Sequence, residues 1–96
     1  MPDVPKGFIQ RILAKDLETG FYAEMQEIAP NSIFPEHRHI NEEWIYVIEG
    51  QVEDEFGEYP MGTFKINKKD SVHAPRSKNG CKLIVVRKGD YELTGK

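Results

Sequence analysis

The chain of 96 residues alternates between short runs of β-forming residues and closely spaced turn residues. The residues between the runs are rich in glycine, proline, asparagine and aspartate, which favour turns. Residues 16–28 are the most helix-like segment, but Gly20 and several aromatic and β-branched residues weaken that alternative. Short strands with frequent turns are typical of a small sandwich or barrel, so we expect an all-β fold. The predicted strands are residues 8–14, 21–29, 32–39, 43–49, 51–56, 63–67, 72–75 and 81–88.

Glycine and proline also predict where the chain turns. Glu49 and Gly50 are predicted to form a two-residue hairpin turn, because glycine accepts a positive φ. Residues 59–62 are predicted to form a further turn and residues 76–80 a loop. Pro35 places its strand at a sheet edge or a bulge. Residues 44–48 are apolar at every position, which is typical of a strand buried on both faces.

The composition is that of a soluble globular protein, and the length predicts a single domain over residues 1–96. The net charge of −3 argues against a nucleic-acid partner, which would require a basic surface. Lys65, Lys68 and Lys69 form a short basic cluster that is predicted to be solvated. No apolar run approaches the roughly 20 residues needed to span a membrane, so no membrane partner is expected. The lack of a signal-peptide pattern and the single cysteine, Cys81, favour a cytoplasmic location.

Three histidines and one glutamate form a candidate metal site. His37 and His39 lie two apart in a predicted strand, so their side chains project to the same side. Glu43 follows after a short polar turn, and His73 lies in another predicted strand. Imidazole nitrogen and carboxylate oxygen suit zinc, iron, manganese, nickel or copper. On the residues alone, a solvated polar strand for the histidines and a turn charge for Glu42 and Glu43 are the alternatives.

The apolar run after Glu43 favours the metal site over these alternatives. A carboxylate that leads into a buried strand needs a partner, because an isolated buried charge is costly. The odd-numbered positions of this stretch carry the candidate ligands and then apolar residues: His37, His39, Glu43, Ile45 and Val47. These side chains share one inward face if the turn keeps the alternation of the two strands in step.

A further pattern of histidine, glutamate and glycine resembles the first motif of the cupin superfamily: His37-x-His39-x3-Glu43-x6-Gly50. Asn31 stands where that motif opens with glycine. The second cupin motif is degraded, but Gly62 and His73 stand at the positions of its first glycine and its histidine ligand. Residues 54–62 and 71–81 are similar to one branch of the superfamily, the C-terminal cupin domain of the anti-sigma factor ChrR.

This resemblance implies a small jelly-roll (double-stranded β-helix) barrel. It also implies that the residues equivalent to the zinc ligands of the ChrR-like branch bind a metal here: His37, His39, Glu43 and His73. Zinc is the favoured ion, with iron(II), manganese or nickel as alternatives. The resemblance does not extend to anti-sigma activity, because ChrR binds its sigma factor with a separate helical zinc domain.

Two functions follow as expectations. The favoured one is a small regulatory module that senses a ligand or an oxidant with a three-histidine, one-glutamate metal site. The alternative is a metal-dependent dioxygenase acting on a small apolar or diketone-like substrate, and the sequence assigns no catalytic residue. Cys81 is expected to be a buried, inert thiol, with a redox-reporting thiol as the alternative.

The partners expected are a small molecule and a second copy of the chain. The inward residues nearest the ligands in register are apolar and predict a small, dry cavity: Ile45, Val47, Leu83 and Val85. The resemblance implies a homodimer, because small cupins often exchange or pair N-terminal strands and residues 8–14 supply an apolar strand. A chain of this size also gains from burying more surface.

Overall fold

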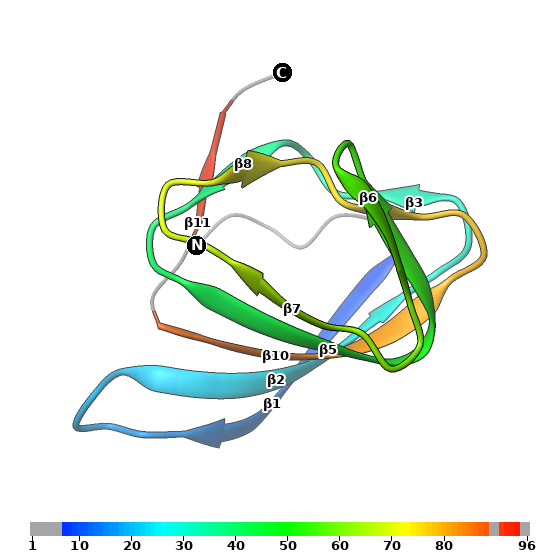
Figure 1. Cartoon of the computed structure of the whole chain (residues 1–96). Coiled ribbons are helices and arrows are strands. Elements are labelled where there is room, and N and C mark those ends of the chain that lie inside the picture. Colours follow the sequence, from blue (N-terminus) through cyan, green and yellow to red (C-terminus); the bar gives the residue numbers. More distant parts are fainter. Residues whose placement is uncertain (1–6, 89–90, 95–96) are drawn as a thin grey trace.

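A computed structural model describes residues 7–88 and 91–94 of the chain, and these residues form strands, turns and loops without a helix (Figure 1). The prediction of an all-β jelly-roll barrel is confirmed. No helix in the described part is long and apolar enough to cross a membrane. The strands are β1 (Phe8–Lys15), β2 (Phe21–Ile28), β3 (Ser32–Ile33), β4 (His37–His39), β5 (Glu43–Asp54), β6 (Gly57–Pro60), β7 (Phe64–Asn67), β8 (Val72–His73), β9 (Arg76–Ser77), β10 (Cys81–Lys88) and β11 (Tyr91–Leu93).

Two curled sheets form the walls of the barrel. The larger sheet has the order β1-β2-β10-β5-β9-β3, with β6 and β7 also paired to β5. The smaller sheet has the order β11-β4-β8. In Figure 1, β8 and β11 lie across the barrel from β10 and β2. All the pairings are antiparallel, so each strand can present alternate residues to the interior.

The hairpin turn predicted at Glu49 and Gly50 is wrong, because β5 runs through both residues. Gly50 does have a positive φ of 76°, but this conformation makes a bulge opposite β10, where the register shifts between Lys82 and Leu83. A Cβ at position 50 would collide with the carbonyl oxygen of Gly80. Glycine is therefore required here by close backbone approach within a bent strand, and the chain turns later, between β5 and β6.

Several short strands also differ from the prediction. Residues 32–39 form two strands, β3 and β4, separated at Pro35, which cannot donate to a ladder. Of the turn predicted at 59–62, residues 59–60 belong to β6 and residues 61–62 do form a turn, and part of the loop predicted at 76–80 forms β9. Strand β11 was not predicted. These segments are only two to four residues long, so local pattern identifies them poorly.

The core lies inside the barrel. It contains Phe8, Ile28, Phe34, Ile45, Val47, Val52, Cys81, Leu83 and Val85. Along β5, Glu43, Ile45 and Val47 are buried, as the odd-numbered parity predicted. The prediction that residues 44–48 are buried on both faces is wrong, because Trp44 and Tyr46 on the other face are each 44% exposed.

Candidate metal centre

The smaller sheet brings the three histidines together. His37 and His39 point inward from β4, and His73 lies directly opposite His37 in the ladder between β4 and β8. One ligating atom of each ring lies within 4.8 Å of the others, and all three residues are buried. The Nε2 atoms of His39 and His73 are 2.9 Å apart. Three strand positions far apart in sequence therefore form one cluster of nitrogen donors.

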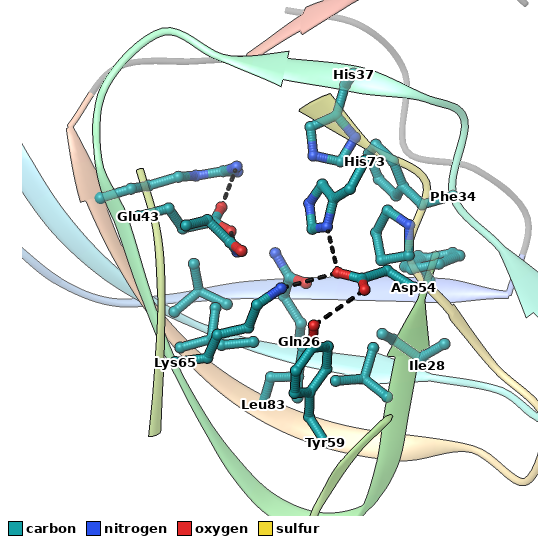
Figure 2. Close-up of a pocket in the computed structure, with 17 residues that line it drawn as sticks. Gln26, Ile28, Phe34, His37, Glu43, Asp54, Tyr59, Lys65, His73 and Leu83 are labelled. Carbon is teal, nitrogen blue, oxygen red and sulfur yellow. Dashed lines mark hydrogen bonds and ion pairs between the residues drawn. The ribbon is translucent and has the colours of Figure 1, made fainter. Parts of the chain in front are cut away.

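Hydrogen bonds hold two of the rings in orientations suited to a metal. The Nδ1 atom of His37 is 3.0 Å from the carbonyl oxygen of Pro35. The Nδ1 atom of His73 is 3.0 Å from Oδ2 of Asp54 (Figure 2). When Nδ1 donates a hydrogen bond in this way, Nε2 keeps its lone pair for a ligand, and metal-binding histidines commonly show this arrangement.

Burial also favours the neutral rings that a metal requires. Desolvation lowers the pKa of His39 to about 4, outweighing the nearby carboxylate of Glu43. Desolvation likewise lowers the pKa of His37. Neutral imidazoles can ligate without first losing a proton. The buried donor set therefore fits a divalent ion of the kind that binds nitrogen ligands.

Glu43 lies beside the three-histidine cluster. Its Oε1 is 3.9 Å from Nε2 of His39, whereas two ligands bonded to one ion at about 2.1 Å can be up to about 4.2 Å apart. The same carboxylate accepts hydrogen bonds from Asn67 Nδ2 at 2.9 Å and from Arg87 at 3.2 Å. The carboxylate is thus near enough to complete the site and is already held in place by two donors.

Arg87 links Glu43 to a second buried carboxylate, which the sequence reasoning missed. The guanidinium donates to Glu24 at 3.0 Å and to the hydroxyl of Tyr22 at 2.7 Å. Burial acts to lower the pKa of Arg87, but the two carboxylates outweigh it and raise the pKa. The sequence did contain a signal for the burial of Arg87. In β10 it alternates in step with Leu83 and Val85, so its side chain points to the same inward side.

Asp54 is the centre of a second network that the sequence did not reveal. Its carboxylate accepts hydrogen bonds from His73, from the hydroxyl of Tyr59 at 3.0 Å and from Lys65 at 2.8 Å (Figure 2). Burial acts to raise the pKa of Asp54, but the bonds from Lys65 and His73 lower it overall. The prediction that Lys65 is solvated is wrong, because its side chain is mostly buried and its Nζ lies 4.2 Å from the centre of the Tyr59 ring.

A cavity of about 50 Å³ lies next to the cluster. It is lined by His37, Glu43 and His73 together with core residues such as Leu83 (Figure 2). The predicted small size is confirmed. The prediction of an apolar lining is wrong in part, because charged and polar groups also line the cavity: Gln26, Asp54, Tyr59, Lys65, Asn67 and Arg87. A space of this size admits a few water molecules or the polar end of a small ligand.

Cys81 is buried at the start of β10, opposite Gly50. Burial raises the pKa of its thiol, which keeps it protonated and unreactive at neutral pH. It is not among the residues that line the cavity beside the histidines. Its position agrees with the expected buried thiol.

Comparison with solved structures finds the same fold in several proteins. An acetylacetone dioxygenase from Acinetobacter johnsonii matches with a TM-score of 0.86 and 13% identity, over 97% of this chain and 70% of that one. A protein of unknown function with a cupin-like fold from Ralstonia eutropha matches with a TM-score of 0.83 and 18% identity, over 94% and 60%. The complex of Rhodobacter sphaeroides SigE with the anti-sigma factor ChrR matches with a TM-score of 0.78 and 24% identity, over 86% and 46%.

These identities are low, so the likenesses demonstrate a shared fold. The chain spans 60–62% of the length of the first two solved structures, both from Ralstonia eutropha. No curated protein sequence matches the chain. The family model of the ChrR cupin-like domain matches residues 2–92, which is nearly the whole chain. With its cupin fold and its cluster of three inward histidines, the chain belongs to the family of ChrR cupin-like domains.

Proposed function

We propose that this cupin domain binds a divalent metal ion through His37, His39, His73 and Glu43, and that it senses a small molecule that enters the adjoining cavity. The convergence of three buried imidazoles beside that cavity supports the proposal. Zinc is the favoured ion, and iron(II), manganese or nickel are alternatives that the same donors suit. When bound, the ion would act as a Lewis acid for an oxygen or nitrogen atom of the ligand.

The residues around the cavity support a small ligand that carries an oxygen atom. Lys65 and Tyr59 place an ammonium group and a hydroxyl group in the cavity wall, both anchored on Asp54. Ile45, Leu83 and Val85 supply the apolar part of the wall. A cavity of about 50 Å³ excludes bulky ligands such as nucleotide sugars. A small molecule with one polar end and one apolar end fits this lining.

Metal titration of single variants tests the site. Elemental analysis of the purified protein should find about one ion per chain. His73→Ala should abolish stoichiometric binding, and Glu43→Gln should weaken zinc affinity by about 10- to 100-fold. Glu42→Gln is the matched control, because Glu42 is the adjacent exposed glutamate and should leave the affinity unchanged. Full zinc occupancy with unchanged affinity in His73→Ala would refute the site.

A dioxygenase is the second candidate, and the hydrogen bonds to Glu43 favour it. If the hydrogen bonds from Asn67 and Arg87 keep this carboxylate off the ion, the three histidines alone bind it. Such a centre leaves positions open for a substrate and oxygen. Reconstitution with iron(II) should then produce oxygen uptake with a small diketone, and zinc should abolish it. Stoichiometric iron binding without oxygen uptake in the presence of a diketone would support the sensing role instead.

A further inference from the structure

The outer side of the larger sheet carries a continuous apolar surface. Residues on β5 and β10 that alternate with the buried ones must project to the outside. The strand registers align these side chains with outward residues of β7 and β2 in two rows. We call these eight residues the outer apolar face: Phe64, Tyr46, Ile84 and Met25 in one row, and Ile66, Trp44, Val86 and Ala23 in the other.

The β7 and β5 residues of this surface are exposed, and its β10 and β2 residues are half-buried. Phe64 is 58% exposed, and Trp44 and Tyr46 are each 44% exposed. The rings of Trp44 and Phe64 contact each other edge-on, with centroids 5.9 Å apart. Four strands about 4.8 Å apart, with about four residues of 3.4 Å along each, give a patch of roughly 260 Å². An apolar patch of a few hundred Å² is often functional, so this face is a candidate interaction surface.

We propose that a second copy of this chain packs against the outer apolar face, with the twofold axis parallel to the strands and between β5 and β10. This axis places β5 of one copy over β10 of the other, and β7 over β2. The β7–β5 half carries the bulky side chains Phe64, Tyr46 and Trp44, whereas the β10–β2 half carries smaller ones, such as Val86 and Ala23. Each bulky half thus packs on a smaller half, as a self-complementary interface requires.

Charges at the two ends of the face select the same axis. At one end of the face, Lys82 on β10 is in register with Glu49 on β5. At the other end, Arg87 is in register with Glu43, so the next residue, Lys88, lies beside Glu42. The proposed axis therefore places Lys82 over the partner's Glu49, and Lys88 over the partner's Glu42. An axis perpendicular to the strands would place Lys82 over the partner's Lys88. Opposite charges meet only in the first arrangement, and like charges facing each other oppose association.

The size of the chain also favours a second copy. A stable interface buries about 800 Å² on each partner, with an apolar centre and a polar rim. The outer apolar face would form the centre, and Phe21, Lys82 and Glu49 would lie on the rim. A chain of about 100 residues buries a modest share of its surface alone, so pairing supplies further burial. Pairing also covers the face of β5 that its sequence suggested was buried.

The first experiment measures mass in solution. Light scattering coupled to gel filtration should give twice the chain mass of 11.1 kDa for the native protein. Tyr46→Glu should raise the dimer dissociation constant by at least about 100-fold, because it places a charge at the apolar centre. Ile33→Glu is the control, since Ile33 is 65% exposed on β3, which pairs with β9 and with none of the four strands of this face. Circular dichroism should show native strand content in both variants.

The second experiment tests the axis. Lys82→Glu and Glu49→Lys should each weaken their own homodimer by about tenfold, because like charges then face each other. A mixture of the two variants should recover dimers, since opposite charges then face each other again between position 82 of one copy and position 49 of the other. A native protein that stays monomeric at about 100 μM would overturn the proposal and leave the face to another partner. A dimer insensitive to Tyr46→Glu, or a mixture that fails to recover, would also overturn it.

Discussion

At the scale of single residues, Asp54 connects the candidate metal centre to the charged wall of the cavity. It accepts a hydrogen bond from His73 on one side and from Lys65 and Tyr59 on the other. A carboxylate behind a ligating histidine fixes the ring and makes its other nitrogen a better donor. Asp54 therefore orients the metal site and also neutralises the ammonium of Lys65.

Asp54→Asn should reduce zinc affinity by about 10- to 100-fold, because the amide holds His73 less firmly. It should also lower the free energy of unfolding by about 1–3 kcal/mol, since Lys65 loses its charged partner. Isothermal titration and urea unfolding measure these two effects. Asp16→Asn is the control, because Asp16 is exposed in the turn between β1 and β2 and asparagine can accept the same turn hydrogen bonds. Equal losses in both variants would contradict a specific role for Asp54.

Arg87 is the residue whose loss should be most damaging outside the apolar core. Arg87→Met would leave the buried carboxylates of Glu24 and Glu43 without their shared partner. Breaking a buried ion pair on one side costs about 3–5 kcal/mol, so the free energy of unfolding should fall by about that amount. Arg76→Met removes an exposed arginine and should change it by less than about 0.5 kcal/mol. Denaturant unfolding of both variants compares them directly.

At the scale of elements, the bend in β5 depends on Gly50. Strand β5 begins with Glu43 in the larger sheet and ends with Asp54, so one strand carries residues of both networks around the cavity. The bulge at Gly50 brings β5 close to the Gly80 carbonyl at the start of β10. A straight strand of this length could not follow the curve of the barrel.

Gly50→Ala should destabilise the protein far more than Gly62→Ala. Both glycines have a positive φ, of 76° and 91°, so both variants lose about 1–2 kcal/mol to backbone strain. A Cβ at position 62 meets open space, whereas one at position 50 collides with the Gly80 carbonyl. The difference between the two variants in thermal or urea unfolding isolates this close approach. Equal losses would show that the backbone at Gly80 can move aside.

At the scale of the whole molecule, the metal-free protein should lose stability as the pH falls from about 6.5 to about 4. Burial lowers the pKa of His39 from 6.5 to about 4, and it also lowers that of His37. In this range the unfolded chain binds protons that the folded state does not, so the free energy of unfolding decreases with falling pH. The shift at His39 alone corresponds to about 3 kcal/mol.

Urea unfolding of the metal-free protein between pH 7 and pH 4 measures this dependence. His39→Gln should flatten the curve in this range, because glutamine does not titrate. With metal bound, the free energy of unfolding of the native protein should fall more steeply as the pH decreases, since protons then compete with the ion for the same nitrogen atoms. A stability that stays constant from pH 7 to pH 4 would contradict the burial of neutral histidines.

Local sequence patterns were sufficient to predict the all-β fold, most of the longer strands and the shared direction of two histidines. These depend on short-range rules: turn residues separate strands, and side chains two apart share a face. His37 and His39 follow that rule directly. His73 was assigned to the same site because it is the third and last histidine of the chain and because it matches the cupin motif. Local geometry alone could not place it there, because the pairing of β4 with β8 joins residues far apart in the chain.

Tertiary packing was needed to reveal which charged residues are buried and which apolar ones are exposed. Lys65 lies in a cluster that reads as solvated, yet pairing with Asp54 compensates its burial. Arg87 is buried because Glu24 and Glu43 approach it from two other strands. Trp44 lies in a run that reads as fully buried, yet none of the described elements covers its face. Burial depends on what packs against a strand from elsewhere in the chain, and a local pattern carries no information about that partner.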